Sequence, residues 1–323
     1  MNLPRIGLYL DLRNPDAARS TTDVYRRSLD RVEYGERHGL GAVWTTEHHA
    51  APDGYLPAPL TALAAVAART SRVRLGTAVA LAPLRHPLAL AEEAAVVDVL
   101  SGGRLELGLG AGWRRSEFDA FGADFDARYR TTERVLRELP EIWASGRASP
   151  RPVQDPVPLW LGARGPIGAR RAGRLGIGLL WLDRDLWEPY ADGLAEGGHH
   201  VAAARMGGLV NVFLADDPDR ARALVAPHAR KARGATYRGG RAPGRPSSLP
   251  PLRFRTPEDA AADVAERIRG LPVTDVFCFD RIGGAPEELC DRHVELLCGA
   301  FRTALTHPPP RRRDPRPGDQ THC

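Results

Sequence analysis

The residues best suited to chemistry are Glu47, His48 and His49, which end the segment VWTTEHH (residues 43–49). An apolar run stops at these residues, just before a loop that contains proline and glycine. Histidine has an ordinary pKa near neutral pH, so two histidines beside a carboxylate can handle protons or bind a metal ion. Adjacent histidines on a strand cannot both ligate one ion without a bend, and no further ligand cluster is evident. The segment therefore favours proton handling.

Composition is that of an ordinary globular protein. The 323 residues are 43% hydrophobic and 26% charged, which suffices for one large domain or at most two. No stretch of about 18 uninterrupted apolar residues occurs, and residues 1–11 read as strand-like sequence rather than a secretory leader. We therefore expect a cytoplasmic protein with no membrane partner.

The net charge of +5 is concentrated in two segments rich in glycine or proline, rather than on a folded face. Residues 228–255 contain eight arginine or lysine residues and no acid. We expect residues 231–255 to form a flexible insertion before the last strand, either without a role or as a lid. Residues 307–323 have the composition of a disordered tail. We expect no nucleic-acid partner and one domain over residues 1–306.

Short apolar runs alternate with helical patterns. Strands are predicted at residues 5–11, 42–47, 73–81, 104–110, 158–162, 177–182, 208–215 and 273–279. Helices are predicted between them, for example at residues 21–38, 58–70, 87–100, 129–144, 167–175 and 287–305. About eight such units without a break predict an α/β fold of the (β/α)8 TIM barrel type. A doubly wound sheet is the runner-up, although Gly108, Gly110 and Gly112 complete only part of its GxGxxG pattern.

A barrel would bring the distinctive residues to one end, because its catalytic groups lie at the C-terminal ends of the strands. The Glu47 motif ends the second predicted strand. The other candidates lie within or after the third, fourth and fifth strands: Thr77, Ala78 and Val79; Gly110, Ala111, Gly112 and Trp113; Ala163, Arg164 and Gly165.

Three segments, in this order, resemble the bacterial luciferase-like monooxygenase family: VWTTEHH (43–49), LGTAVALAPLRHP (75–87) and DVLSGGRLELGLGAGWRRSEFDAFG (98–122). Two shorter segments, PLWLGA (158–163) and RRAGRLG (170–176), extend the resemblance to about residue 180. The resemblance implies a luciferase-like barrel that binds reduced FMN, or a deazaflavin coenzyme in sister enzymes, at the C-terminal ends of the strands.

By this resemblance, His48 is the histidine beside the flavin ring, and Glu47 and His49 complete its motif. Neighbouring residues of a strand point to opposite faces, so we expect His48 to face the flavin and His49 to be structural. Ala78 and Val79 match the position of a non-proline cis peptide beneath the flavin ring.

The loop at residues 110–113 matches the family segment that runs along the flavin, where glycines let the backbone approach a ligand closely. Luciferase itself has an arginine for the FMN phosphate where this chain has Ala111. We expect the phosphate to be bound instead by Arg164, the amide of Gly165 and the start of the following helix.

The resemblance implies a flavin-dependent oxidoreductase. We favour a monooxygenase that receives reduced FMN from a flavin reductase and uses O2, through a flavin 4a-hydroperoxide that His48 hydrogen-bonds or protonates, to oxygenate a small organic substrate. The alternative is a deazaflavin-dependent oxidoreductase that transfers hydride to or from an alcohol, imine or enone, with His48 as general acid or base. A second alternative is a noncatalytic flavin-binding partner subunit. The Ala-rich helices at residues 58–70 and 87–100, together with the resemblance, imply a homodimer.

Overall fold

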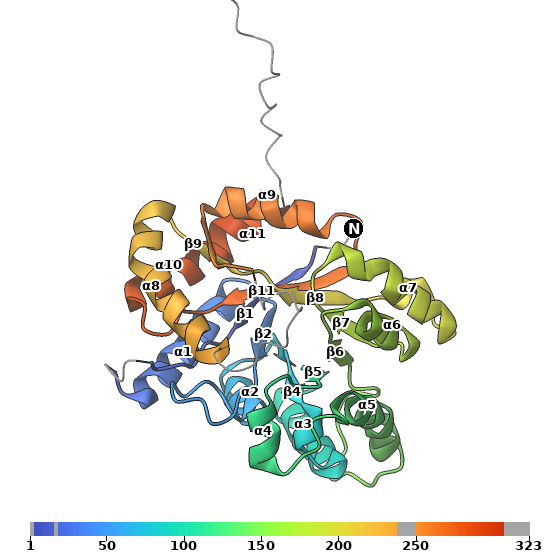
Figure 1. Ribbon diagram of the computed structural model, residues 1–323. Helices are drawn as coiled ribbons and strands as arrows, with labels where there is room; N and C mark the ends of the chain where they lie inside the picture. Colours follow the sequence, from blue (N-terminus) through green and yellow to red (C-terminus); the bar gives the residue numbers. More distant parts are fainter. Residues whose placement is uncertain (1–2, 16–18, 238–249, 307–323) are drawn as a thin grey trace, which may run out of the picture.

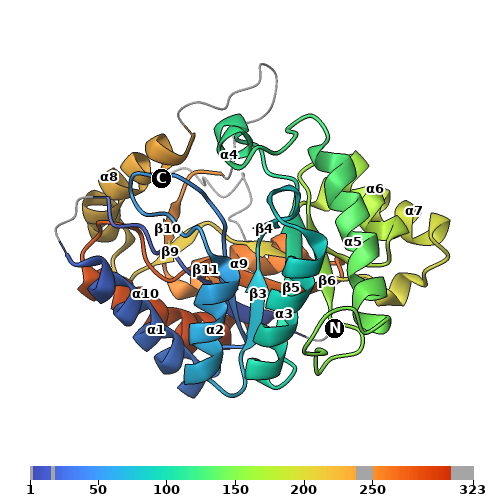
Figure 2. The same cartoon turned by 90° about the horizontal axis from the view of Figure 1, so that it is seen from below.

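A closed sheet of parallel strands, surrounded by helices, forms the centre of the computed structural model, which describes residues 3–15, 19–237 and 250–306 (Figures 1 and 2). The strands follow one another as β3-β2-β1-β11-β8-β7-β6-β5-β4, and pairing between β3 and β5 closes the ring. The ring contains nine strands, but β3 and β4 are consecutive parts of one strand position, because both pair with β5. The sheet therefore has eight positions, and the predicted (β/α)8 barrel is confirmed. The barrel strands are β1 (Arg5–Tyr9), β2 (Ala42–Thr45), β3 (Arg74–Thr77), β4 (Ala80–Leu81), β5 (Leu105–Gly110), β6 (Leu159–Gly162), β7 (Gly178–Leu180), β8 (Met206–Leu209) and β11 (Val273–Phe279).

The helices surround the barrel, and most begin and end where local signals place them. In α3, for example, the His86 ring accepts a hydrogen bond from the amide of Leu88, Pro87 occupies the first position, and Gly102 ends the helix at φ +64°. The helices are α1 (Thr21–Arg37), α2 (Pro59–Arg69), α3 (Pro87–Ser101), α4 (Arg115–Phe121), α5 (Arg128–Ala144), α6 (Pro166–Arg174), α7 (Trp187–Glu196), α8 (Pro218–Tyr237), α9 (Pro257–Ile268), α10 (Glu287–Leu296) and α11 (Arg302–Thr306).

The structure corrects the bounds or the regularity of three elements predicted for the C-terminal third. The insertion expected at residues 231–255 begins inside α8 and ends in β10 (Arg253–Arg255), which pairs in parallel with β9 (Val212–Leu214). Residues 208–215 are not one strand, because the chain turns after β8 and forms β9 outside the barrel. The helix expected at residues 287–305 contains a π-helical turn, Leu297–Phe301, between α10 and α11. Residues 238–249 and the predicted tail, residues 307–323, lie outside the described residues.

Buried ionic groups fill the N-terminal end of the barrel. The carboxylate of Glu106 accepts hydrogen bonds from Arg5 at 3.0 Å, from Arg74 at 2.9 Å and from the Trp160 indole at 2.8 Å. Arg5 also donates to both oxygens of Asp275, at 2.9 and 2.8 Å. These side chains come from β1, β3, β5, β6 and β11, so one cluster connects five strands.

Two tryptophans fill the middle of the barrel. Trp44 and Trp160 are fully buried, and their rings meet edge to face with centroids 5.8 Å apart. Gly76 and Gly178 make room for them, because a Cβ atom at either position would lie 2.2 Å from a ring carbon. The barrel is therefore filled from its N-terminal end to its middle, which leaves the C-terminal end for a site.

Glu106→Ala tests the ionic cluster. The variant removes the buried carboxylate from the partly buried Arg74 and Arg5, so the free energy of unfolding should fall by about 3–5 kcal/mol. Urea denaturation measures the change. Glu106→Gln keeps the volume and an acceptor for Trp160, and its loss should be smaller than that of Glu106→Ala. A loss below about 1 kcal/mol in the alanine variant would show that the cluster contributes little.

His293 in α10 gives the fold a predicted pH dependence. Its Nδ1 accepts a hydrogen bond from the Leu214 amide at 2.8 Å, and Nε2 lies 3.0 Å from the Phe279 carbonyl oxygen, to which it donates. Burial lowers the pKa of His293 from 6.5 to about 4. Between these values the unfolded chain binds a proton that the folded chain does not, so stability should fall as the pH falls through this range, by roughly 3 kcal/mol in total.

Urea unfolding at pH 7, 5.5 and 4.5 measures this dependence. His293→Gln should be less stable at pH 7 but should lose less stability on acidification than the unchanged protein. The exposed His199 supplies the matched control, and His199→Gln should leave the pH dependence as it is. Equal slopes for the His293 variant and the unchanged protein would contradict the prediction.

Candidate active site

All the site residues predicted from the sequence lie at the C-terminal end of the barrel. The Glu47 motif follows β2, which ends at Thr45, and residues 78–79 separate β3 from β4. Residues 111–113 follow β5, and residues 163–165 follow β6. Because these strands are parallel, the structure brings the four segments to the same rim.

The two histidines lie against different carboxylates. The His48 ring stacks on Tyr55, with centroids 4.3 Å apart and planes inclined by 14°, and its Nδ1 lies 3.7 Å from the Glu117 Oε1. The Nε2 of His49 lies 2.8 Å from the Glu47 Oε1, while its ring edge meets Phe121. Both residues lie beyond the end of β2, so their divergence arises from the loop rather than from strand alternation.

Glu47 is a buried residue that connects three segments. One carboxylate oxygen accepts a hydrogen bond from the amide of Leu81 at 2.9 Å. The other accepts hydrogen bonds from the His49 ring at 2.8 Å and from the Arg85 guanidinium at 3.3 Å. With these contacts, Glu47 holds the β2 loop against β4 and the turn before α3.

Glu117, in α4, is a residue that the sequence reasoning missed. It is 2% exposed, and its Oε1 accepts a hydrogen bond from the His49 amide at 3.0 Å. Burial tends to raise the pKa of this carboxyl, but interactions with His48, the His49 amide and Arg114 bring it below its ordinary value of 4.5. Helix α4 was not among the predicted helices, and its seven residues are too few for a clear periodic pattern.

Burial lowers the pKa of His48 below its ordinary value of 6.5, and the positive charges of Arg114 and Arg13 lower it further, whereas Glu117 opposes them. At neutral pH the pair therefore consists of a neutral imidazole and an ionised carboxylate. A neutral imidazole can accept a proton, so the arrangement suits a general base.

The peptide bond between Ala78 and Val79 is cis, as the resemblance predicted. Tyr9 donates a hydrogen bond of 2.7 Å to the Ala78 carbonyl oxygen. The Val79 side chain lies over two interior glycines, since a Cβ atom at Gly110 or Gly162 would lie 2.3 or 2.5 Å from its methyl carbons.

Thr77, in contrast, belongs to the barrel wall. It is fully buried, and its hydroxyl donates a hydrogen bond to the Gly108 carbonyl oxygen at 2.6 Å. The hydroxyl oxygen of Thr77 also accepts a hydrogen bond from the Gly108 amide at 2.9 Å. In the β5 loop, Gly112 has a φ of +69°, and Trp113 and Arg114 form a cation–π pair, with the guanidinium carbon 5.3 Å from the ring centroid.

The predicted phosphate-binding residues form an open helix start at the rim. Gly165 precedes Pro166, the first residue of α6, and a Cβ atom at Gly165 would meet nothing within 4 Å. The exposed Arg164 places its guanidinium carbon 4.8 Å from the Trp181 ring centroid, and Ala163 packs against Gly168. A helix N-terminus beside a guanidinium can bind an anion.

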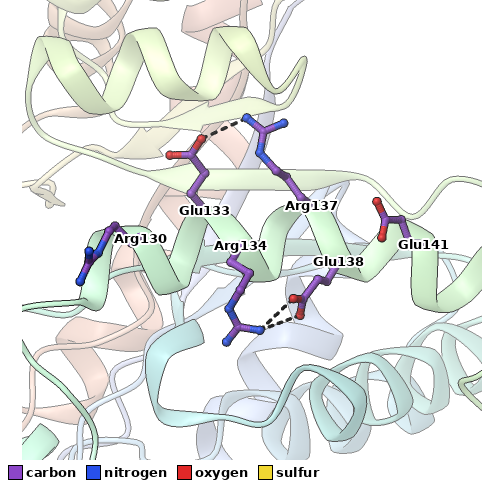
Figure 3. Close-up of a pocket in the computed structure, with 6 residues that line it drawn as sticks. All are labelled: Arg130, Glu133, Arg134, Arg137, Glu138 and Glu141. Carbon is purple, nitrogen blue, oxygen red and sulfur yellow. Dashed lines mark hydrogen bonds and ion pairs between the residues drawn. The ribbon is translucent and has the colours of Figure 1, made fainter.

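A hollow lies on the outer surface of α5, and none of the predicted site residues lines it. It measures about 360 Å³ and is lined by Arg130, Glu133, Arg134, Arg137, Glu138 and Glu141. Figure 3 shows two arginine–glutamate pairs along the helix, Arg134 with Glu138 at 2.9 Å and Arg137 with Glu133 at 3.0 Å. Its charges therefore compensate one another.

Within residues 3–15, 19–237 and 250–306, no three histidine, cysteine or acidic side chains are arranged to hold a metal ion. None of the helices in this part of the chain combines the length and apolarity that crossing a membrane requires.

A family model described as luciferase-like monooxygenase matches residues 5–292. A segment of 179 residues is 30% identical to the oxygenase component of a flavin-dependent trigonelline monooxygenase from Acinetobacter baylyi, covering 50% of this chain and 49% of that protein. Over 189 residues the chain is 32% identical to an F420-dependent glucose-6-phosphate dehydrogenase from Amycolatopsis mediterranei, covering 51% of this chain and 56% of that protein. The chain thus spans about half the length of these curated relatives.

Among solved structures, the monooxygenase RslO1 from Streptomyces bottropensis resembles this chain with a TM-score of 0.77 at 24% identity, covering 91% of this chain and 97% of that one. This likeness supports the luciferase-like barrel.

Gly110→Ala tests the packing at the rim. The added methyl group would collide with Val79, so the free energy of unfolding should fall by about 1–3 kcal/mol. Combining it with Val79→Ala should recover part of this loss, because the second change removes the colliding methyl carbons. Thermal and urea denaturation measure both effects. The matched control is Gly165→Ala, whose Cβ meets open space and should change stability by less than about 0.5 kcal/mol; additive losses in the double variant would contradict the contact.

Proposed function

The chain belongs to the luciferase-like monooxygenase family, and from this premise we propose that it is a flavin-dependent monooxygenase that oxygenates a small organic substrate with reduced FMN and O2. The observation that carries the proposal is a neutral, largely buried histidine, His48, at the C-terminal rim of the barrel beside Glu117. A proton acceptor of this kind, in a site with little water, suits flavin chemistry.

The residues of the rim fit FMN. The glycines of the β5 loop allow a flat ring system close to the backbone. Arg164 and the amides at the open start of α6 fit the phosphate, and the open space at Gly165 supports this assignment. Bound reduced FMN would supply the electrons with which O2 is activated.

The protein's own groups would orient the substrate, exclude water and move protons. Tyr9, Tyr55 and Phe279 are each less than a tenth exposed and would form an aromatic wall that keeps water away. His48 would take or return a proton at its ring nitrogen, and the stacking on Tyr55 would hold its ring in place. His49 and Glu47 would hold the loop that carries His48.

We propose that a separate flavin reductase supplies the reduced FMN. The support is the trigonelline monooxygenase relative, which is named as an oxygenase component. We also propose that the chain forms a homodimer through α2 and α3. In its favour, α3 exposes Val96, Val99 and Leu100 to between 42% and 55%.

Hydride transfer with a deazaflavin coenzyme is the second candidate. The F420-dependent relative favours it, at 32% identity. The exposed Arg164 and the α6 N-terminus would also suit the anionic tail of such a coenzyme. His48 would then exchange a proton with an alcohol, imine or enone.

Anaerobic titration of the purified protein with reduced FMN and, separately, with a reduced deazaflavin tests the proposal. We expect tight binding of FMN, followed by a transient absorbance when oxygen is admitted. His48→Ala should still bind FMN but should lose about 10²–10⁴-fold in turnover, since it removes the acid–base group. His199→Ala, at an exposed position, is the control.

Selective binding of the deazaflavin, with no oxygen-dependent signal, would move the protein to hydride transfer. Binding of FMN without turnover on a panel of aldehydes, ketones, amines and aromatic compounds would favour a noncatalytic flavin-binding subunit. Binding of neither cofactor would contradict the assignment.

A further inference from the structure

We infer that Glu117 is a positioning residue that sets the tautomer of His48, so that Nδ1 carries the hydrogen and Nε2 accepts a proton from a ligand O–H or N–H group. The inference rests on the proposed function for the identity of the ligand. The arrangement of Glu117 and His48 rests on the structure of this chain and can be tested without a cofactor.

The His48 ring is restrained on one face. Its ring lies 4.3 Å from that of Tyr55, nearly parallel, and the Arg13 guanidinium carbon lies 4.4 Å from the centroid of the same tyrosine. Both His48 and Arg13 therefore pack on the Tyr55 ring. The stack holds the plane of the imidazole, and in this plane Nδ1 faces Glu117 at 3.7 Å.

The position of Glu117 does not depend on His48. Its Oε1 accepts the His49 amide at 3.0 Å, and the next residue of α4, Phe118, is fully buried against Phe125 and Gly112. The carboxylate is therefore held in place from two directions before it meets the imidazole.

The charges select the tautomer. Nδ1 of His48 is buried, has no hydrogen-bond partner among the described residues, and faces the ionised Oε1 of Glu117 at 3.7 Å. A nitrogen lone pair facing a carboxylate oxygen would be repelled, so the hydrogen belongs on Nδ1. The contact is longer than a hydrogen bond, and protonation of the imidazole would strengthen the attraction across it. Nε2 is left with the lone pair.

The neighbouring pair, Glu47 and His49, has the opposite arrangement. His49 donates from Nε2 at 2.8 Å to a carboxylate that also receives Leu81 and Arg85. Its Nε2 is therefore committed to the loop. Of the two histidines, His48 is the one whose Nε2 is left for a ligand.

The proton transfer balances without another reactant. The ligand O–H or N–H bond breaks, its electron pair stays on the oxygen or nitrogen, and a new bond forms between the proton and Nε2. The carboxylate of Glu117 stabilises the imidazolium, whereas Arg13 and Arg114, the cations near the ring, oppose it. The chemical class of ligand that fits is a weakly acidic hydroxyl or N–H compound, such as a phenol, an enol or an alcohol.

Long-range ¹H–¹⁵N correlation spectra of the protein labelled with ¹⁵N-histidine test the inference. We expect His48, identified by loss of its signals in His48→Gln, to be the neutral Nδ1–H tautomer at pH 7. Glu117→Gln retains an acceptor for the His49 amide but removes the charge. This variant should mix the two tautomers and lower the pKa of His48 by about one unit.

Glu47→Gln is the matched control, since it should alter the His49 signals and leave the His48 tautomer in place. Unchanged His293 signals verify that each variant is folded. An Nε2–H tautomer in the unchanged protein, or a His48 tautomer and pKa that Glu117→Gln does not alter, would overturn the inference.

Kinetics with the cofactor that binds gives a second readout. Glu117→Gln should lower kcat about 10-fold or more and move the acid limb of the kcat/KM profile to lower pH, while Glu117→Asp restores part of both. A purely structural role would lower stability without moving the pH profile. Because the spectra need no flavin, the tautomer result stands or falls independently of the FMN titration.

Discussion

The barrel depends most directly on the hydrogen bonds and ion pairs that the carboxylate of Glu106 forms in its interior. A closed ring of parallel strands encloses a column of space, which side chains must fill without leaving unpaired charges. At its N-terminal end this column contains Arg5, Arg74 and Asp275, and Glu106 neutralises two cations while accepting the indole of Trp160. One residue of β5 thereby connects directly to β1, β3 and β6, and through Arg5 to β11. With that end filled by charged side chains and the middle by tryptophan, the candidate site lies at the opposite rim.

That rim is built from segments far apart in the chain, and each contributes a different physical property. The loop after β2 supplies the histidines, and α4 supplies the buried carboxylate of Glu117. The interior glycines Gly110 and Gly162 leave room for Val79 at the same level. Backbone amides help to hold these groups, because Glu47 accepts a hydrogen bond from the amide of Leu81 and Glu117 accepts one from the amide of His49. These contacts tie the loop after β2 to β4 and α4.

Electrostatics explains why one site can serve both flavin branches represented among the relatives. Burial and two nearby cations keep His48 neutral, while one anion can stabilise its protonated form. A base with these properties suits both oxygenation and hydride transfer, because each reaction requires a proton to move near the flavin or deazaflavin ring. What separates the branches is recognition of the cofactor tail and the substrate. In our proposal, Arg164 and the start of α6 recognise the cofactor tail, whereas His48 acts at the flavin ring.

The sequence by itself determined the barrel and placed the motif Glu47-His48-His49 at its rim. These two conclusions depend on strand and helix periodicity and on the order of the motifs, which are local properties of the chain, whereas the cis peptide between Ala78 and Val79 was expected only from the family resemblance. Only the tertiary structure decided that Glu117 meets the histidines, because the His49 amide and this carboxylate are 68 positions apart and α4 is too short to leave a pattern. The pairing of β9 with β10 escaped prediction for the same reason. Three-residue strands carry almost no periodic signal, and their pairing depends on which segments the closed barrel brings together.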